Sequence, residues 1–202
     1  MSVFTDELIA FCLEEWAFFR KGEIKLNGTT VAGRKEYEDG AYERVADYWK
    51  EIGGPYKNLT GKDRGYAWSA AFISYAFKIV GAGDKFPYSA GHSKYINKAI
   101  SNAANGALDA PIVGHKLNSY SLKPGDLIGY WRGGEVISYE NARRIGWYES
   151  HTDIVVAIDD KFAYAIGGNV NHSVTRRQVR TNARGQLTDR SQNWFVVIQN
   201  NL

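Results

Sequence analysis

Cysteine is nearly absent from this chain of 202 residues, in which Cys12 is the single example. One cysteine excludes a disulfide framework within the chain. Cys12 lies at helical spacing from Leu8 and Trp16, so we expect it to be a core residue and not a nucleophile. Histidine is also scarce, with four examples and no HxxxH spacing, and no CxxC spacing occurs. The sequence therefore predicts neither a metal centre nor a cofactor.

Long apolar runs and a charge of one sign are lacking as well. No segment approaches the roughly 18 to 20 apolar residues that span a bilayer. The start, MSVFTDELIAFCLEEW, has no basic stretch followed by an apolar one, which a secretion signal would have. The net charge is +3 with acids and bases scattered along the chain, so there is no basic stripe to attract nucleic acid. We expect a protein made in the cytoplasm without a signal peptide, a membrane span or a nucleic-acid partner.

Apolar and aromatic residues are present in amounts that favour one substantial core, at 44% and 14% of the chain. We therefore predict one domain over residues 1–202. Helical spacing of apolar residues predicts four helices. They are expected from Thr5 to near Gly22, over Tyr42–Ile52, over Trp68–Val80 and through the segment HSKYINKAISNAA.

The periodicity changes in the second half of the chain, where short β-branched or aromatic runs alternate with turn residues. The runs are DLIGYW, TDIVVAI, FAYAI, VTRRQV and NWFVVIQ, and we expect turns at Asp159–Asp160 and Gly167–Gly168. This pattern is typical of an antiparallel sheet. Helices followed by strands predict an α+β fold and not alternating βαβ units.

Ser69 is the first candidate for chemistry. It falls in the opening turn of the predicted helix Trp68–Val80, where unpaired backbone N–H groups and the helix dipole favour a nucleophile and an oxyanion. The alternative is that Ser69 is a helix N-cap, which is a common role for serine.

His151 and Asn169 are the candidates that could assist Ser69. His151 lies at the start of a predicted strand and titrates near neutral pH, so it is suited to act as a base; the alternative is an ordinary surface histidine. Asn169 follows Gly167–Gly168 and could orient the imidazole, or it could be a turn residue. Asp153 is expected to share a strand face with His151, where it could tune the imidazole or face solvent.

The order of these segments resembles that of the papain-like amidases of the NlpC and CHAP kind. Within that superfamily, five segments are similar to a bacterial domain family of unknown function: YAWSAAFISYAF, FPYSAGHSKYI, PGDLIGY, HTDIVVAI and IGGNVNHSV. The resemblance covers roughly Tyr48 to Val174. It implies a papain-like α+β fold in which N-terminal helices pack on an antiparallel sheet. Residues 1–60 would form a helical extension and residues 61–202 the catalytic core.

The resemblance also implies roles for the candidate residues. Ser69 falls where the better-known amidases have cysteine, His151 falls on the catalytic histidine, and Asn169 falls near the residue that orients it. A serine hydroxyl has a much higher pKa than a thiol, so Ser69 requires firm assistance from a base.

Several further residues are candidates for a supporting or substrate-binding role. His92 resembles a fixed feature of the same family and could border the cleft, or it could be a helix-start histidine bonded to a carbonyl. Asp63 and Tyr66, on the loop before Ser69, could contact substrate or pack within the loop. Trp68 completes this supporting group.

Two functional hypotheses follow. The first is a hydrolase that cleaves an amide bond in peptidoglycan peptides: a lysin or a toxin-like antibacterial effector. It would reach the periplasm or a target-cell envelope by a non-classical route and would have an immunity protein or a secretion adaptor as partner. The second is an inactive papain-like module that binds a wall peptide, a glycan or a protein. The enzyme requires Ser69 Oγ within hydrogen-bond reach of His151.

Overall fold

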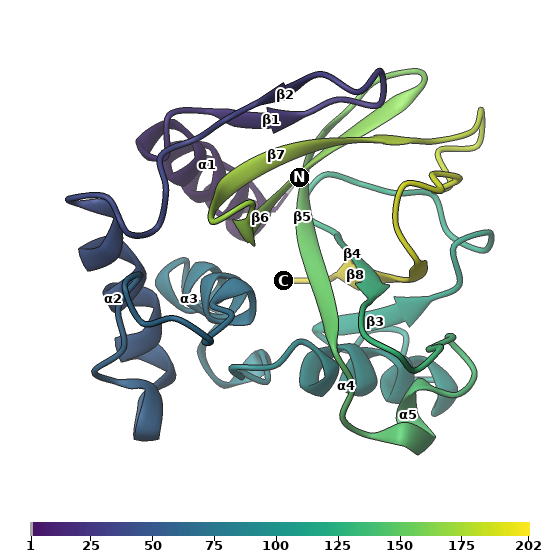
Figure 1. The fold of residues 1–202 in the computed structure, drawn as a ribbon. Helices are drawn as coiled ribbons and strands as arrows, with labels where there is room; N and C mark the ends of the chain where they lie inside the picture. The colour runs from purple at the N-terminus through teal and green to yellow at the C-terminus, as the bar shows by residue number, and fades with distance from the viewer. Residues whose placement is uncertain (1) are drawn as a thin grey trace.

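The computed structural model describes residues 2–202, which form helices and one mixed sheet (Figure 1). The α-helices are α1 (Val3–Phe18), α2 (Ala41–Ile52), α3 (Ser69–Ile79), α4 (Ser93–Ala104) and α5 (Ala142–Ile145), with short 3-10 turns at Gly54–Tyr56 and Gly83–Lys85. The strands are β1 (Gly22–Ile24), β2 (Thr30–Val31), β3 (Ile112–His115), β4 (Leu127–Trp131), β5 (Ser150–Ile158), β6 (Phe162–Val170), β7 (Ser173–Arg180) and β8 (Trp194–Asn200). The α+β class, the four long helices and the five predicted strands are confirmed.

The sheet has the strand order β2-β1-β7-β6-β5-β4-β8-β3. Every neighbouring pair is antiparallel except β1 and β7, which are parallel. The prediction of an antiparallel sheet is therefore corrected to a mixed one. The parallel pair arises because β1 and β2 come from the glycine- and threonine-containing segment after α1, which joins the sheet as an edge hairpin.

Side chains of the central strands alternate between two apolar cores. In β5, Ile154 packs into the larger core beneath the helices, whereas Val155 packs into a smaller core on the opposite face. Such alternation is the expected geometry of a strand. Helices α1 and α3 pack against β5 and β6, while α4 lies against β3 and β8 (Figure 1). The helices α1, α3 and α4 therefore cover one face of the sheet.

Helix α3 lies unusually close to β6 because of a glycine. A side-chain Cβ at Gly168 would lie 2.5 Å from Phe72 Cβ and 2.7 Å from the Trp68 ring. The glycine pair predicts a turn at Gly167–Gly168, but β6 continues through both residues to Val170. The glycine pair is therefore explained by close packing of the helix on the strand.

The first helix joins the rest of the molecule through its buried face. Leu8 and Cys12 are fully buried in the larger core, as predicted for Cys12, and burial raises the pKa of its thiol. Glu15, also on α1, accepts a hydrogen bond from Arg44 Nε at 2.9 Å and another from Tyr48. The first 60 residues thus share one core with the strands. No helix within residues 2–202 is long and apolar enough to cross a membrane.

Candidate active site

Ser69 is the first residue of α3. Its hydroxyl Oγ lies 2.7 Å from His92 Nε2, and the residue is 2% exposed. The structure shows no side-chain cap on α3, so the N-cap interpretation of Ser69 is wrong. The first N–H groups of a helix have no partner within it, and here they lie beside the serine hydroxyl. Local backbone geometry therefore suits a nucleophile next to oxyanion donors.

His92 directly precedes α4 and is held at its second nitrogen by two hydroxyls. Its Nδ1 lies 3.0 Å from Thr152 Oγ1 and also contacts the hydroxyl of Tyr95. Burial lowers the pKa of His92 well below 6.5, and the nearby His151 and Arg132 act in the same direction. His92 is therefore a neutral imidazole at physiological pH, and its Nε2 can accept the Ser69 proton.

His151 belongs to a second polar group, on the opposite face of β5. Its Nε2 lies 2.8 Å from Asp153 Oδ1, and Arg177 Nε donates to Asp153 Oδ2 at 3.4 Å. Burial lowers the pKa of His151 despite the raising effect of Asp153. Burial alone would raise the pKa of Asp153, but His151 and Arg177 hold it below its usual value. This group is an Asp153 carboxylate shared by a neutral imidazole and a guanidinium.

The expected contact between Ser69 and His151 is absent, because strand geometry separates them. His151 pairs with Tyr130 across β4 and β5 and lies on the face of the smaller core, whereas Thr152 faces the helices. His92 fills the position next to Ser69 instead. The His92 and His151 rings remain neighbours, with centroids 5.2 Å apart. His151 Nδ1 is buried and has no hydrogen-bond partner within residues 2–202.

Asn169 does not contact His151, whose Nε2 is bound by Asp153 and whose Nδ1 has no partner within residues 2–202. The Asn169 amide instead donates to Glu36 Oε2 at 3.1 Å and accepts from the Trp68 backbone N–H at 3.2 Å. Trp68 is buried and donates its indole N–H to the same Glu36 carboxylate. Asn169, Trp68 and Glu36 therefore fix the start of α3, and with it the position of Ser69.

A cavity of about 470 Å³ gives access to the Ser69–His92 pair. Its walls include Arg132, Trp147 and the loop before α3, which contributes Gly65 and Ala67. Trp147 is 73% exposed and forms an aromatic rim. The arrangement is a buried serine–histidine pair at the wall of an open cavity.

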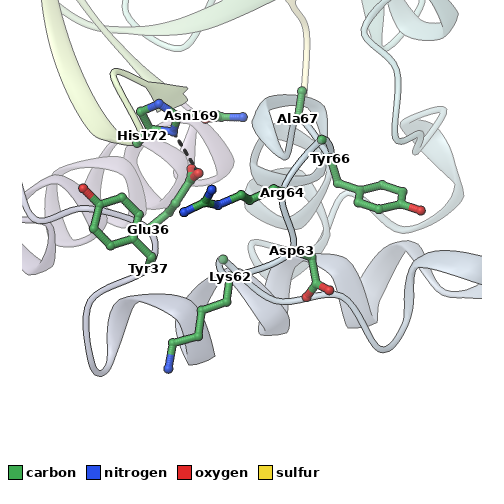
Figure 2. Close-up of a pocket in the computed structure, with 11 residues that line it drawn as sticks. Glu36, Tyr37, Lys62, Asp63, Arg64, Tyr66, Ala67, Asn169 and His172 are labelled. Carbon is green, nitrogen blue, oxygen red and sulfur yellow. Dashed lines mark hydrogen bonds and ion pairs between the residues drawn. The ribbon is translucent and has the colours of Figure 1, made fainter.

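Asp63 and Tyr66 border a neighbouring cavity of about 820 Å³ and not the one that contains Ser69. Figure 2 shows both side chains pointing away from Glu36, whereas the Arg64 side chain extends toward it. Asp63 accepts hydrogen bonds from the backbone N–H and hydroxyl of Thr60, both at 2.8 Å, and so shapes its own loop. Tyr66 is half exposed.

The sequence over residues 36–199 matches a family described as an uncharacterized protein conserved in bacteria (DUF2272). The chain belongs to this family. The match starts after β2 and covers every helix and strand from α2 to β8, including Ser69, His92 and His151. Neither the curated proteins nor the solved structures give a match to the chain.

Several residues of the site were not predicted from the sequence. Tyr95 and Thr152 hold His92, while Arg177 neutralises Asp153 and Arg132 lines the cavity. Tyr95 lies three residues after His92 on a predicted helix, a spacing that could have revealed the contact. Thr152 and Arg177 come from the separate strands β5 and β7, and Arg132 directly follows β4, so only the sheet register brings them to the site.

Proposed function

We propose that this protein is an acyl hydrolase, an amidase or peptidase, in which Ser69 is the nucleophile and His92 its base. The proposal rests on the 2.7 Å hydrogen bond between Ser69 Oγ and His92 Nε2 beside an open cavity. A serine hydroxyl is a weak nucleophile unless a base within hydrogen-bond reach removes its proton. His92 is unprotonated because burial lowers its pKa, so it is in the form that a base requires.

The reaction would proceed in two stages. Ser69 Oγ attacks the carbonyl carbon of the substrate while its proton passes to His92 Nε2, and the N–H groups at the start of α3 stabilise the oxyanion. His92 then protonates the leaving amine, which departs as the acyl–Ser69 ester forms. In the second stage, water attacks the ester with His92 again as base, which releases the acid and restores Ser69. The Tyr95 and Thr152 hydroxyls hold the imidazole orientation throughout.

The resemblance to papain-like amidases supports a peptide amide as the scissile bond, with peptidoglycan peptides as the substrate class. In support, the nucleophile helix α3 packs on β5 and β6, as expected for helices on a sheet in that superfamily, although the base is His92 and not the strand residue His151. The exposed indole of Trp147 at the cavity rim adds a surface for a peptide or a sugar. Delivery as an effector or a lysin belongs to the same proposal.

A specific observation also favours the second candidate, a binding module. His92 has hydroxyl partners at Nδ1 and no carboxylate, so an imidazolium formed there would gain less stabilisation than in an Asp–His pair. A module of this kind would use the same cavity without chemistry at Ser69.

The two candidates are separated by incubating the wild-type protein and the Ser69→Ala variant with purified peptidoglycan fragments. Mass spectrometry should show an amide cleaved by the wild type alone. A fluorophosphonate probe, which phosphonylates an activated serine whatever the natural substrate, should label Ser69. Intact fragments together with an unlabelled Ser69 would favour the binding module.

A further inference from the structure

A separate cavity of about 340 Å³ is lined by residues of β1, β4, β6 and β7 and of the loops that follow them, and it shares Arg132 with the cavity of Ser69. Its polar lining residues are Tyr130, Arg132, Asn169, Asn171, Arg177 and Gln192. No aspartate or glutamate of the described chain lines it. The cavity therefore presents hydrogen-bond donors and positive charge with no acid in its lining.

Arg177 is the buried cation of this cavity. Its side chain is only 8% exposed, and its one ion pair in residues 2–202 joins Nε to Asp153 Oδ2 at 3.4 Å. Asp153 is also the partner of His151, and the two terminal Nη groups of Arg177 make no hydrogen bond to any described residue. These Nη groups are not among the fully buried polar atoms that lack a partner, so they reach the open space of the cavity. Arg177 therefore carries unused donors at the wall of the cavity.

Arg132 adds a second cation. Its guanidinium makes no ion pair or hydrogen bond to a side chain in the described part of the protein. The two arginines carry two positive charges and Asp153 carries one negative charge, so this group has a net charge of +1. Glu149 is the acid that lines the Ser69 cavity, and it forms no ion pair with Arg132 within residues 2–202.

We infer that this cavity is an oxyanion-binding site, which holds a carboxylate or a phosphate group between Arg132 and Arg177. A guanidinium binds such groups through two parallel N–H donors, and two guanidiniums can share one oxyanion. Because Arg132 also lines the Ser69 cavity, the site would select substrates with an anionic group near the scissile bond. That last role rests on the proposed function; the binding itself does not.

The test measures binding without turnover, on the Ser69→Ala protein, by isothermal titration calorimetry. The probes are N-acetyl-alanyl-alanine, its C-terminal amide and inorganic phosphate. One of the two oxyanions should bind at least about tenfold more tightly than the amide, and its affinity should fall as salt is raised. Tighter binding of phosphate would identify a phosphate group as the ligand chemistry, and tighter binding of the free peptide would identify a carboxylate.

Matched variants assign the binding to this cavity. Arg132→Gln should weaken oxyanion binding about tenfold or more, since a charged hydrogen bond is lost. Arg144→Gln removes an exposed arginine outside the cavity and should leave the affinity unchanged. Glu149→Gln should leave it unchanged or tighten it. The inference would be overturned by equal affinity for the amide and the oxyanions, or by no binding of any probe. It would also be overturned if Arg132→Gln and Arg144→Gln weakened binding equally. Because these proteins lack Ser69, the result is independent of whether the wild type hydrolyses anything.

Discussion

Which histidine can act as the base of Ser69 depends on the face of β5 toward which the side chains of residues 151 to 153 point. The Thr152 side chain lies on the helix-covered face and contacts His92, whereas the side chains of His151 and Asp153 lie on the opposite face. His151 nevertheless has a carboxylate at Nε2 and a free Nδ1, which is the arrangement of an oriented base. The geometry favours His92, and single variants can separate the two histidines.

We predict that His92→Gln decreases the rate of fluorophosphonate labelling of Ser69 by about 100-fold or more, which is the usual contribution of a general base. Glutamine keeps a polar group near Ser69 Oγ but cannot take its proton. His151→Gln should reduce labelling much less, because its contact with Ser69 is indirect. The reverse order, with His151→Gln the more damaging, would assign the base to His151. Circular dichroism of both variants controls for folding.

Burial of the histidines also predicts a pH dependence of stability. The pKa of His92 in the folded protein lies well below 6.5, so below that pH the unfolded chain binds protons more readily than the folded one. His92 therefore lowers the free energy of unfolding as the pH falls. Burial raises the pKa of Asp126 to about 6, which has the opposite sign but is common to the wild type and to a His92 variant.

The free energy of unfolding of the wild type minus that of His92→Gln should therefore decrease as the pH falls from 7.5 to 5.5, because only the wild type has a buried histidine that stays neutral while its unfolded chain gains a proton. Urea denaturation at the two pH values measures it. A difference that is constant or that widens on acidification would mean that His92 is not buried as a neutral imidazole. The pH at which Ser69 labelling begins to fail should likewise lie below 6.5.

At the scale of elements, the position of α3 depends on the glycine beneath it. Gly168→Ala would place a Cβ against Phe72 and Trp68, so we expect a loss of about 1–3 kcal/mol in the free energy of unfolding. Labelling of Ser69 should also slow, because α3 must shift. Gly134 has open space around its Cβ position and a permissive backbone, so Gly134→Ala is the matched control and should change neither. Equal effects of both substitutions would show that the contact at Gly168 is unimportant.

The helices and strands differ in how well they can be predicted from the sequence. The helices from α2 to α4 are predictable because their apolar residues follow helical spacing. The strands β1 and β2 are not, since they have three and two residues and lie in a segment that reads as a linker. The sequence also does not show which histidine contacts Ser69. Residues 150–156 are buried on both faces of β5, so no alternation of polar and apolar residues shows which way His151 points.

On the scale of the whole molecule, the residues that precede the family match are part of the same core. Leu8 and Phe19 are fully buried, β1 extends the sheet beside β7, and Glu15 satisfies the buried hydroxyl of Tyr48. Residues 2–35 therefore contribute core packing, sheet pairing and a buried polar partner together. A chain of residues 36–202 would expose the apolar surface that α1 covers on β5, β6 and β7.

We predict that residues 36–202 alone lack cooperative thermal unfolding, because several buried contacts are lost at once and together they are comparable with the whole stability of a domain, about 5–15 kcal/mol. Near-ultraviolet circular dichroism and a thermal melt measure this. Leu8→Ala in the full chain provides a graded control and should cost about 2–5 kcal/mol while leaving a single transition. A truncated chain that melts cooperatively near the temperature of the intact protein would mean that α1 and β1 are an accessory layer, and that the residues from Glu36 onward suffice to hold Ser69 against His92.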